Sequence, residues 1–121
     1  MSKPSVDERL ELLEEELQGE FPAKIKVAAT LAPEMFEGYT KMREGILKEG
    51  RLSRKSKVLI AVGLLTAQRA DETLSLYCRM ALNAGATKEE LIEAMSVGVI
   101  FSGGPSIVTM SNVIQELNLA S

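Results

Sequence analysis

The sequence predicts an all-α fold, a single-domain bundle of about six to seven helices over residues 1–121. Apolar residues recur with helical spacing along the whole chain, and no run alternates as a strand would. Capping residues, glycines and prolines fall between these periodic segments, where helices begin and end. The length of 121 residues and the apolar share of 45% suit one compact domain.

Three helices are expected in the N-terminal part of the chain. The first spans residues 6–18, where leucines form one stripe, and Gly19 ends it. A short helix follows over residues 22–31 with a proline in its first turn. Pro33 opens the third helix, which is expected over residues 34–48.

The C-terminal part begins with two helices that have a polar residue at their start. Ser53 is expected to cap a helix over residues 53–69. The middle of this helix is apolar on every side, which predicts burial on every side. Asp71 is expected to cap the next helix, over residues 71–84.

The last two helices are separated by a break. Thr87 and Glu90 have the spacing of a capping box, which predicts the start of a helix over residues 87–101. The Gly-Gly-Pro sequence at 103–105 interrupts the helical pattern, and Pro105 opens the final helix.

Two of these helices carry more apolar surface than a small monomer can hide. Residues 58–65 and 91–101 are almost continuously apolar. Burying the surplus against another subunit stabilises an assembly by roughly 25 cal/mol per Å². We therefore expect a homo-oligomer, and a tightly packed monomeric core is the alternative.

The composition excludes several kinds of catalytic site. The chain contains no histidine, and Cys78 is its only cysteine. A histidine zinc site, a Ser-His-Asp triad, a Cys-His dyad, an intrachain disulfide and a dithiol redox pair therefore cannot form within this chain. No metal and no cofactor is predicted.

The charge pattern predicts neither a nucleic-acid partner nor a membrane partner. The formal net charge is -3, without the basic excess typical of a nucleic-acid binder. The first 17 residues turn acidic where a signal peptide would be apolar. The longest apolar run, over residues 58–65, is much shorter than the roughly 20 residues that cross a bilayer. We expect a cytoplasmic protein.

Three phrases of the sequence resemble a known family. They are the Ala-Leu-Asn-Ala-Gly-Ala-Thr-Lys-Glu-Glu-Leu-Ile-Glu-Ala string at 81–94, the Phe-Ser-Gly-Gly-Pro string at 101–105, and the basic entry to a buried helix at 50–57. In this order and spacing they resemble the carboxymuconolactone decarboxylase family, which includes the alkyl hydroperoxidase D-like proteins. The resemblance covers about residues 30–118. It implies an all-helical fold and assembly into trimers or hexamers.

The positions that carry chemistry in this family hold other residues here. The resemblance places the cysteine pair of the peroxidase branch on Ala70 and Thr73, its histidine on Tyr77 and its glutamate on Val58. The decarboxylase branch also has a histidine at the position of Tyr77. The residues that both branches use for catalysis are therefore replaced.

Glu72 and Tyr77 are the candidate catalytic residues. Glu72 lies at the helix end where the family keeps its reactive groups, and with partial burial it would act as a general acid or base. Tyr77 would donate a hydrogen bond to an oxyanion or a carboxylate, with Thr73 as a further polar group. In the alternative interpretation, Glu72 and Asp71 only compensate the helix dipole, and Tyr77 packs in the core.

Two functions remain open at this point, and so does the question of whether the protein is an enzyme. One is a carboxymuconolactone decarboxylase-like oligomer with a rebuilt small-molecule pocket, either an acid–base lyase or isomerase or a non-catalytic binder. The other is a peroxiredoxin-like oxidoreductase that acts on hydroperoxides through Cys78, although a lone cysteine is more often a buried small hydrophobe. The basic cluster at residues 51–57 is either a salt-bridged face or an anion site, and residues 102–106 form either a turn or a weak anion site.

Overall fold

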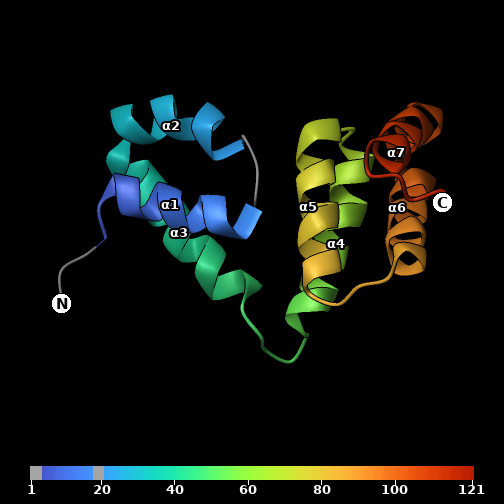
Figure 1. Cartoon of the computed structure of the whole chain (residues 1–121), viewed down its shortest axis with the longest axis horizontal. Coiled ribbons are helices and arrows are strands. Elements are labelled where there is room, and N and C mark those ends of the chain that lie inside the picture. The colour runs from blue at the N-terminus through green and yellow to red at the C-terminus, as the bar shows by residue number, and fades with distance from the viewer. Residues whose placement is uncertain (1–3, 18–20) are drawn as a thin grey trace. The chain divides into compact units, whose positions relative to one another are not determined.

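The structure, a computed structural model, describes residues 4–17 and 21–121, and every regular element within them is an α-helix (Figure 1). The predicted all-α fold is confirmed. The described helices are α1 (Val6–Leu17), α2 (Phe21–Leu31), α3 (Pro33–Leu47), α4 (Arg54–Ala67), α5 (Asp71–Asn83), α6 (Lys88–Ser102) and α7 (Gly104–Glu116). Each agrees with a predicted helix to within one or two residues at its ends. The expected end of the first helix at Gly19 lies outside the described residues.

The chain divides into two compact units, Met1–Lys48 and Glu49–Ser121. We call them the N-terminal unit and the C-terminal unit. The expectation that the chain folds as a single domain stays a prediction. None of the described helices is long and apolar enough to cross a membrane, and the cytoplasmic location also stays a prediction.

The N-terminal unit contains α1, α2 and α3, which pack on one another. The leucine stripe of α1 is buried, as its spacing predicts. Polar contacts add to this packing, because the Arg9 guanidinium of α1 donates a hydrogen bond of 2.8 Å to the Thr40 hydroxyl of α3. Arg43 of α3 also forms an ion pair with Glu16 of α1.

The C-terminal unit is arranged around α4, which packs against α5 and α6 and also contacts α7 (Figure 1). Ser53 caps α4 as predicted, because its hydroxyl accepts a hydrogen bond of 3.0 Å from the Ser56 amide. One face of α4 and the inner faces of its neighbours form the core of the unit. Its fully buried apolar side chains include Val58, Val62, Leu74, Cys78, Ala81, Leu91, Met95 and Val113.

The predicted capping box at the start of α6 is also confirmed. The Thr87 hydroxyl accepts a hydrogen bond of 3.1 Å from the Glu90 amide, and the Glu90 carboxylate accepts one of 2.9 Å from the Thr87 amide. At the other end of α6, Gly103 has a φ of 82°, a backbone conformation that favours glycine. The chain can therefore turn sharply there and begin α7.

The second face of α4 is not buried within one chain. Val58 and Val62 are fully buried, but Ile60 is 52% exposed and Leu64 is 59% exposed. The expectation that the middle of this helix is buried on every side is thus not met by the single chain. An apolar strip of α4 reaches the surface of the C-terminal unit beside α6.

Two glycines let α4 and α6 approach each other closely. A Cβ atom added to Gly98 of α6 would lie 2.3 Å from the carbonyl oxygen of Gly63 on α4 and 3.0 Å from the Cβ atom of Thr66. Side chains at either glycine would push the helices apart. The shortest separation of α4 and α6 is therefore set by backbone atoms and not by side chains.

Replacing Gly98 with alanine should destabilise the protein by about 1–3 kcal/mol. The added methyl group meets a backbone oxygen, which can move only if the helix moves with it. Urea unfolding would measure the change. Gly45→Ala is the matched control, since Gly45 is exposed inside α3 with open space around it. That variant should gain roughly 0.5–1 kcal/mol from better helix propensity. A Gly98→Ala protein as stable as the wild type would contradict the close approach.

Candidate functional site

The first turn of α5 carries two acidic residues with different surroundings. The Asp71 carboxylate accepts a hydrogen bond of 2.8 Å from the side-chain amide of Asn112 on α7. This bond, together with one from Thr109, lowers the pKa of Asp71 below its usual value. Glu72 is exposed to solvent. Asp71 is therefore held as an anion that connects α5 to α7.

The prediction that Asp71 caps α5 is wrong. Ala70 occupies the N-cap position, and no side chain caps the helix there. Asp71 is the first residue inside the helix, where its charge still compensates the helix dipole. Its carboxylate accepts a hydrogen bond from Asn112, a residue 41 positions away.

Tyr77 lies farther along α5 and is half-buried. Since α5 is a regular helix, a spacing of five residues turns Tyr77 about 140° away from Glu72. Thr73 is also half-buried and precedes Tyr77 by four residues, so these two share one face of the helix. The helix therefore brings Thr73 and Tyr77 together and leaves Glu72 at its exposed end.

Cys78 is a buried thiol with no exposed surface. Burial raises its pKa to about 12, and the charge of the neighbouring Arg79 offsets this only in part. A thiol attacks peroxides and disulfides as a thiolate. At neutral pH this side chain therefore behaves as a small apolar core group.

The remaining family positions are structural here. Val58, at the position where the resemblance places a glutamate, is fully buried in the core of the C-terminal unit. Ala70, at the first cysteine position, begins α5 as its N-cap. Within residues 4–17 and 21–121, no three histidine, cysteine, aspartate or glutamate side chains converge on a point where a metal ion could bind.

The basic cluster at residues 51–57 has acidic neighbours. Lys55 forms an ion pair of 3.1 Å with Glu90 of α6, and the Arg54 amide donates a hydrogen bond of 2.9 Å to the Glu49 carboxylate. These contacts agree with the salt-bridged alternative. The serines of the break after α6 bond to backbone: the Ser102 hydroxyl donates to the Ala67 carbonyl at 2.7 Å.

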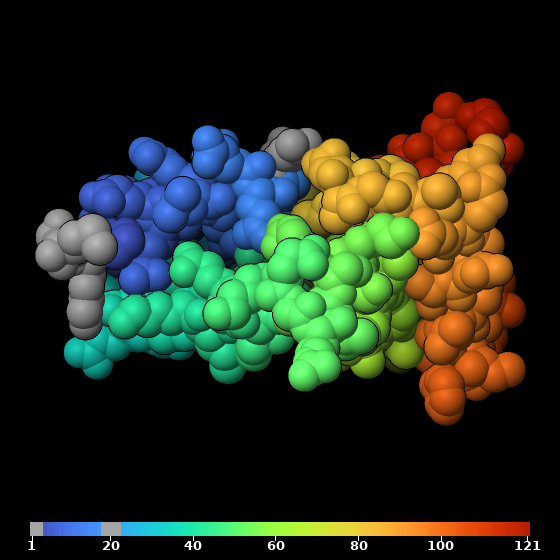
Figure 2. Space-filling view, turned by 90° about the horizontal axis from the view of Figure 1, so that it is seen from below, coloured from blue at the N-terminus to red at the C-terminus, as the bar shows by residue number. Residues whose placement is uncertain are grey.

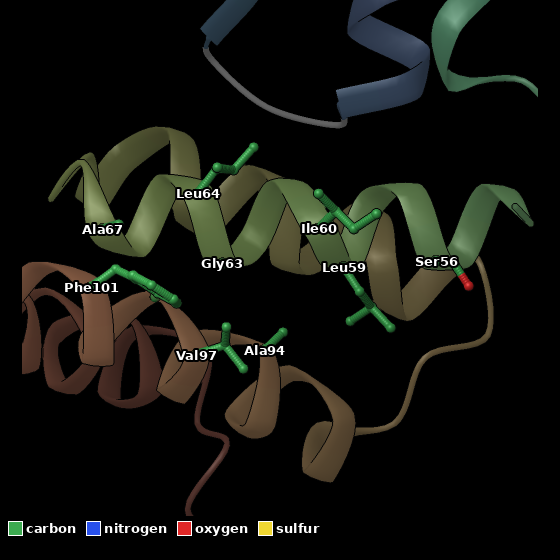
Figure 3. Close-up of a pocket in the computed structure, with 10 residues that line it drawn as sticks. Ser56, Leu59, Ile60, Gly63, Leu64, Ala67, Ala94, Val97 and Phe101 are labelled. Carbon is green, nitrogen blue, oxygen red and sulfur yellow. The ribbon is translucent and has the colours of Figure 1, made fainter.

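A separate apolar groove of about 530 Å³ runs between α4 and α6 (Figure 3). Neither Glu72, Tyr77 nor Cys78 lines it. Its only polar side chain is Ser56, at the N-terminal end of α4. The sequence pointed to these two helices through their surplus of apolar residues, but it did not reveal a groove between them. The lining residues are Ser56, Leu59, Ile60, Gly63, Leu64, Ala67, Ala94, Val97, Gly98 and Phe101.

The sequence model of the carboxymuconolactone decarboxylase family matches residues 33–116, from the start of α3 to the end of α7. The chain belongs to the carboxymuconolactone decarboxylase family. The resemblance drawn from the sequence phrases is thereby confirmed.

Three relatives show how far this similarity extends. A nitrosuccinic acid decarboxylase from Metarhizium robertsii is 35% identical over 65 residues, which are 54% of this chain and 46% of that protein. An uncharacterized 15.0 kDa protein from Paracoccus denitrificans is 32% identical over 97 residues, 76% of this chain and 68% of that protein. An uncharacterized protein from Methanocaldococcus jannaschii is 22% identical over 98 residues, 80% of this chain and 94% of that protein. The match thus spans less than half of the decarboxylase, and no solved structure matches significantly.

The buried thiol of this family member should respond to pH in a defined way. The raised pKa of Cys78 stabilises the folded state below the ordinary thiol pKa of 9.0. Between pH 9 and about 12, wild type should lose up to about 1.4 kcal/mol per pH unit relative to Cys78→Ala, because only the unfolded thiol ionises there. Urea unfolding of both proteins across this range measures the difference. A difference that does not change with pH would contradict the raised pKa.

Asn112→Ala should raise the pKa of Asp71 towards its ordinary value of 3.8. At pH 7 the variant should be less stable by at most about 1 kcal/mol, since the lost bond is exposed to water. Because a lowered pKa stabilises the fold above the unfolded value, this loss should fade as acid protonates Asp71. Carboxyl NMR titration and urea unfolding would measure both effects. Gln115→Ala, an exposed amide on the same helix, is the control and should change neither.

Proposed function

We propose that the protein is a decarboxylase-like lyase that acts on a small organic acid with the acid–base and hydroxyl groups of α5. Membership of the carboxymuconolactone decarboxylase family supports the class of reaction. So does the similarity to a nitrosuccinic acid decarboxylase, whose matched segment covers 54% of this chain. The observation that carries the proposal is that two hydroxyl side chains, Thr73 and Tyr77, share a half-buried face of α5, while the chain's one thiol is buried with its pKa raised to about 12.

A decarboxylation needs groups of the kind that α5 offers. The carbon–carbon bond to the carboxylate breaks, carbon dioxide leaves, and the electron pair moves into an adjacent carbonyl or nitro group. A proton is then added to the same carbon, so no electron is gained or lost overall. Hydrogen-bond donors stabilise the transient anion, and a general acid supplies the proton.

The hydrogen-bond donors and the general acid lie on different parts of α5. Thr73 and Tyr77 share one half-buried face, so their hydroxyl groups would donate hydrogen bonds to the transient oxyanion. Glu72 lies about 140° around the helix in the first turn, so it would reach the substrate from the end of α5. Substrate bound across this end would also cover Glu72, which is exposed in the free chain.

We further propose that the active form is a homo-oligomer, a trimer or hexamer as the family resemblance implies. Large apolar side chains stand exposed on both units, including Leu31 on α2 and Phe101 on α6. Soluble monomers rarely leave so much apolar surface in contact with water. Contacts between subunits would bury it.

The proposed chemistry is tested by measuring carbon dioxide release from carboxymuconolactone and from nitrosuccinic acid. Tyr77→Phe should lower kcat about 10²–10³-fold through loss of an oxyanion donor, and Glu72→Gln about 10²–10⁴-fold through loss of the general acid. Glu89→Gln is the matched control, because Glu89 is also an exposed glutamate in a first helical turn. Full activity in both α5 variants, or no release from any tested acid, would contradict the proposal.

The peroxiredoxin-like alternative has a separate test. Hydroperoxide consumption with an added thiol reductant should be absent in wild type, because a thiol with a pKa of about 12 is not ionised near pH 7. Cys78→Ala should behave in the same way. Turnover in wild type that disappears in this variant would favour the oxidoreductase over the lyase.

A further inference from the structure

The outer face of α1 carries a dense group of carboxylates. Four of them are exposed and line one surface hollow of about 660 Å³, those of Glu8, Glu11, Glu14 and Glu15. Figure 2 shows α1, in blue, at the surface of the N-terminal unit. Glu11 is three or four residues from each of the other three, and like charges at that spacing destabilise a helix. Repulsion within this group therefore opposes the helical form of α1.

The C-terminal end of α1 adds to this effect. Its last turn contains Glu14, Glu15 and Glu16 and no basic residue. The C-terminus is the negative end of the helix dipole, where acidic side chains are unfavourable and basic ones are favourable. Glu16 is neutralised by Arg43 of α3, whereas none of the four exposed carboxylates forms an ion pair within residues 4–17 and 21–121.

Arg9, the one basic residue of α1, is buried instead of lying among these carboxylates. The residue is 5% exposed, and it donates a hydrogen bond of 2.8 Å to Thr40 of α3. Its Nε atom is buried and has no hydrogen-bond partner. Among the residues that the structure describes, no carboxylate forms an ion pair with Arg9. Burial of a cation without a counter-charge costs free energy, which the bond to Thr40 offsets only in part.

Apolar contacts hold α1 in place against these effects. Leu10, Leu13 and Leu17 are buried, and α1 packs on both α2 and α3. Their burial does not depend on screening, whereas repulsion between exposed charges weakens as salt shortens the Debye length. A helix of 12 residues is also too short to persist alone in water. Detachment of α1 therefore unfolds it, and salt changes the balance between the two states.

We propose that α1 is a detachable helix, fastened to α2 and α3 when cations in solution screen its carboxylates and released when they do not. α1 lies outside residues 33–116, the segment that the family model matches. Its release does not depend on the proposed decarboxylation, because none of the α5 candidates belongs to α1. On release, Thr40 and Arg43 of α3 lose their partners on α1 and become accessible to water. Ionic strength thus converts a buried face of α3 into an exposed polar surface.

Hydrogen exchange of the full-length protein, followed by mass spectrometry, tests the salt dependence. Amides of residues 6–17 should exchange roughly tenfold more slowly at about 1 M sodium chloride than at about 0.01 M, as the Debye length falls from about 30 Å to about 3 Å. Amides of residues 88–102 in α6 are the internal reference and should change much less. Equal exchange of α1 at both salt concentrations, or protection as strong as that of α6 at low salt, would overturn the proposal.

A charge reversal in α1 tests the role of its carboxylates. Glu15→Lys places a cation in the last turn and four residues after Glu11, which are both favourable positions. It should therefore slow the exchange of α1 at low salt. Glu93→Lys makes the same change of charge at an exposed site on α6, so it is the matched control and should leave α1 unchanged. Low-salt exchange of α1 in Glu15→Lys that equals that of wild type would contradict the switch.

Arg9→Met tests the buried cation. Methionine keeps much of the length of the side chain and removes the unpaired charge, so α1 should exchange severalfold more slowly at both salt concentrations. If Arg9 served only to tie α1 to α3 through Thr40, the same variant would exchange faster than wild type. Faster exchange therefore rejects the detachable helix. Carbon dioxide release is not measured here, so failure of this switch and failure of the proposed chemistry are distinguishable.

Discussion

The C-terminal unit depends on the contact between the backbones of α4 and α6 at Gly63 and Gly98. A Cβ atom at Gly98 would come within 2.3 Å of a carbonyl oxygen, so the helices meet without side chains between them. Their large side chains therefore project to either side of the contact, towards the core or towards the surface. The Lys55–Glu90 ion pair and the Ser102–Ala67 hydrogen bond fix the two ends. The core and the exposed groove are thus two consequences of one close approach.

The same core makes Val58 and Cys78 unsuited to thiol chemistry. Val58 and Cys78 have no exposed surface, and a carboxylate or a thiolate at either position would lose its hydration without a compensating partner. The pKa of Cys78 is accordingly raised to about 12. The groups of α5 that keep contact with solvent are the Glu72 carboxylate and the half-buried Thr73 and Tyr77. These are the oxygen groups on which the proposed proton transfer and hydrogen bonding rest.

Local sequence signals predicted most of the fold. The features that they did not predict depend on contacts between residues far apart in the sequence. The helices and the caps at Ser53 and Thr87 follow from spacing and side-chain type within a few residues, which a sequence displays directly. The interpretation of Asp71 as a cap failed because Ala70 occupies the N-cap position, and the bond from Asp71 to Asn112, 41 residues away, could not be foreseen from local sequence. The hollow beside Gly98 was equally unpredictable, since it requires knowing that Gly63 lies opposite. For the candidate site, the sequence named the residue types on α5 but not their burial, which depends on the packing of α4 and α7.

The two faces of α4 differ in their surroundings. Val58 and Val62 point into the core on which α5 packs, whereas Ile60 and Leu64 lie roughly 200° around the helix from them. A substitution at Ile60 or Leu64 therefore changes the groove without touching a residue of the core, and a substitution on α5 leaves the groove intact. Covering the exposed apolar side chains of the groove would stabilise the folded state without any change in the core. One helix thus carries a buried face and an exposed apolar face whose sequences can vary independently.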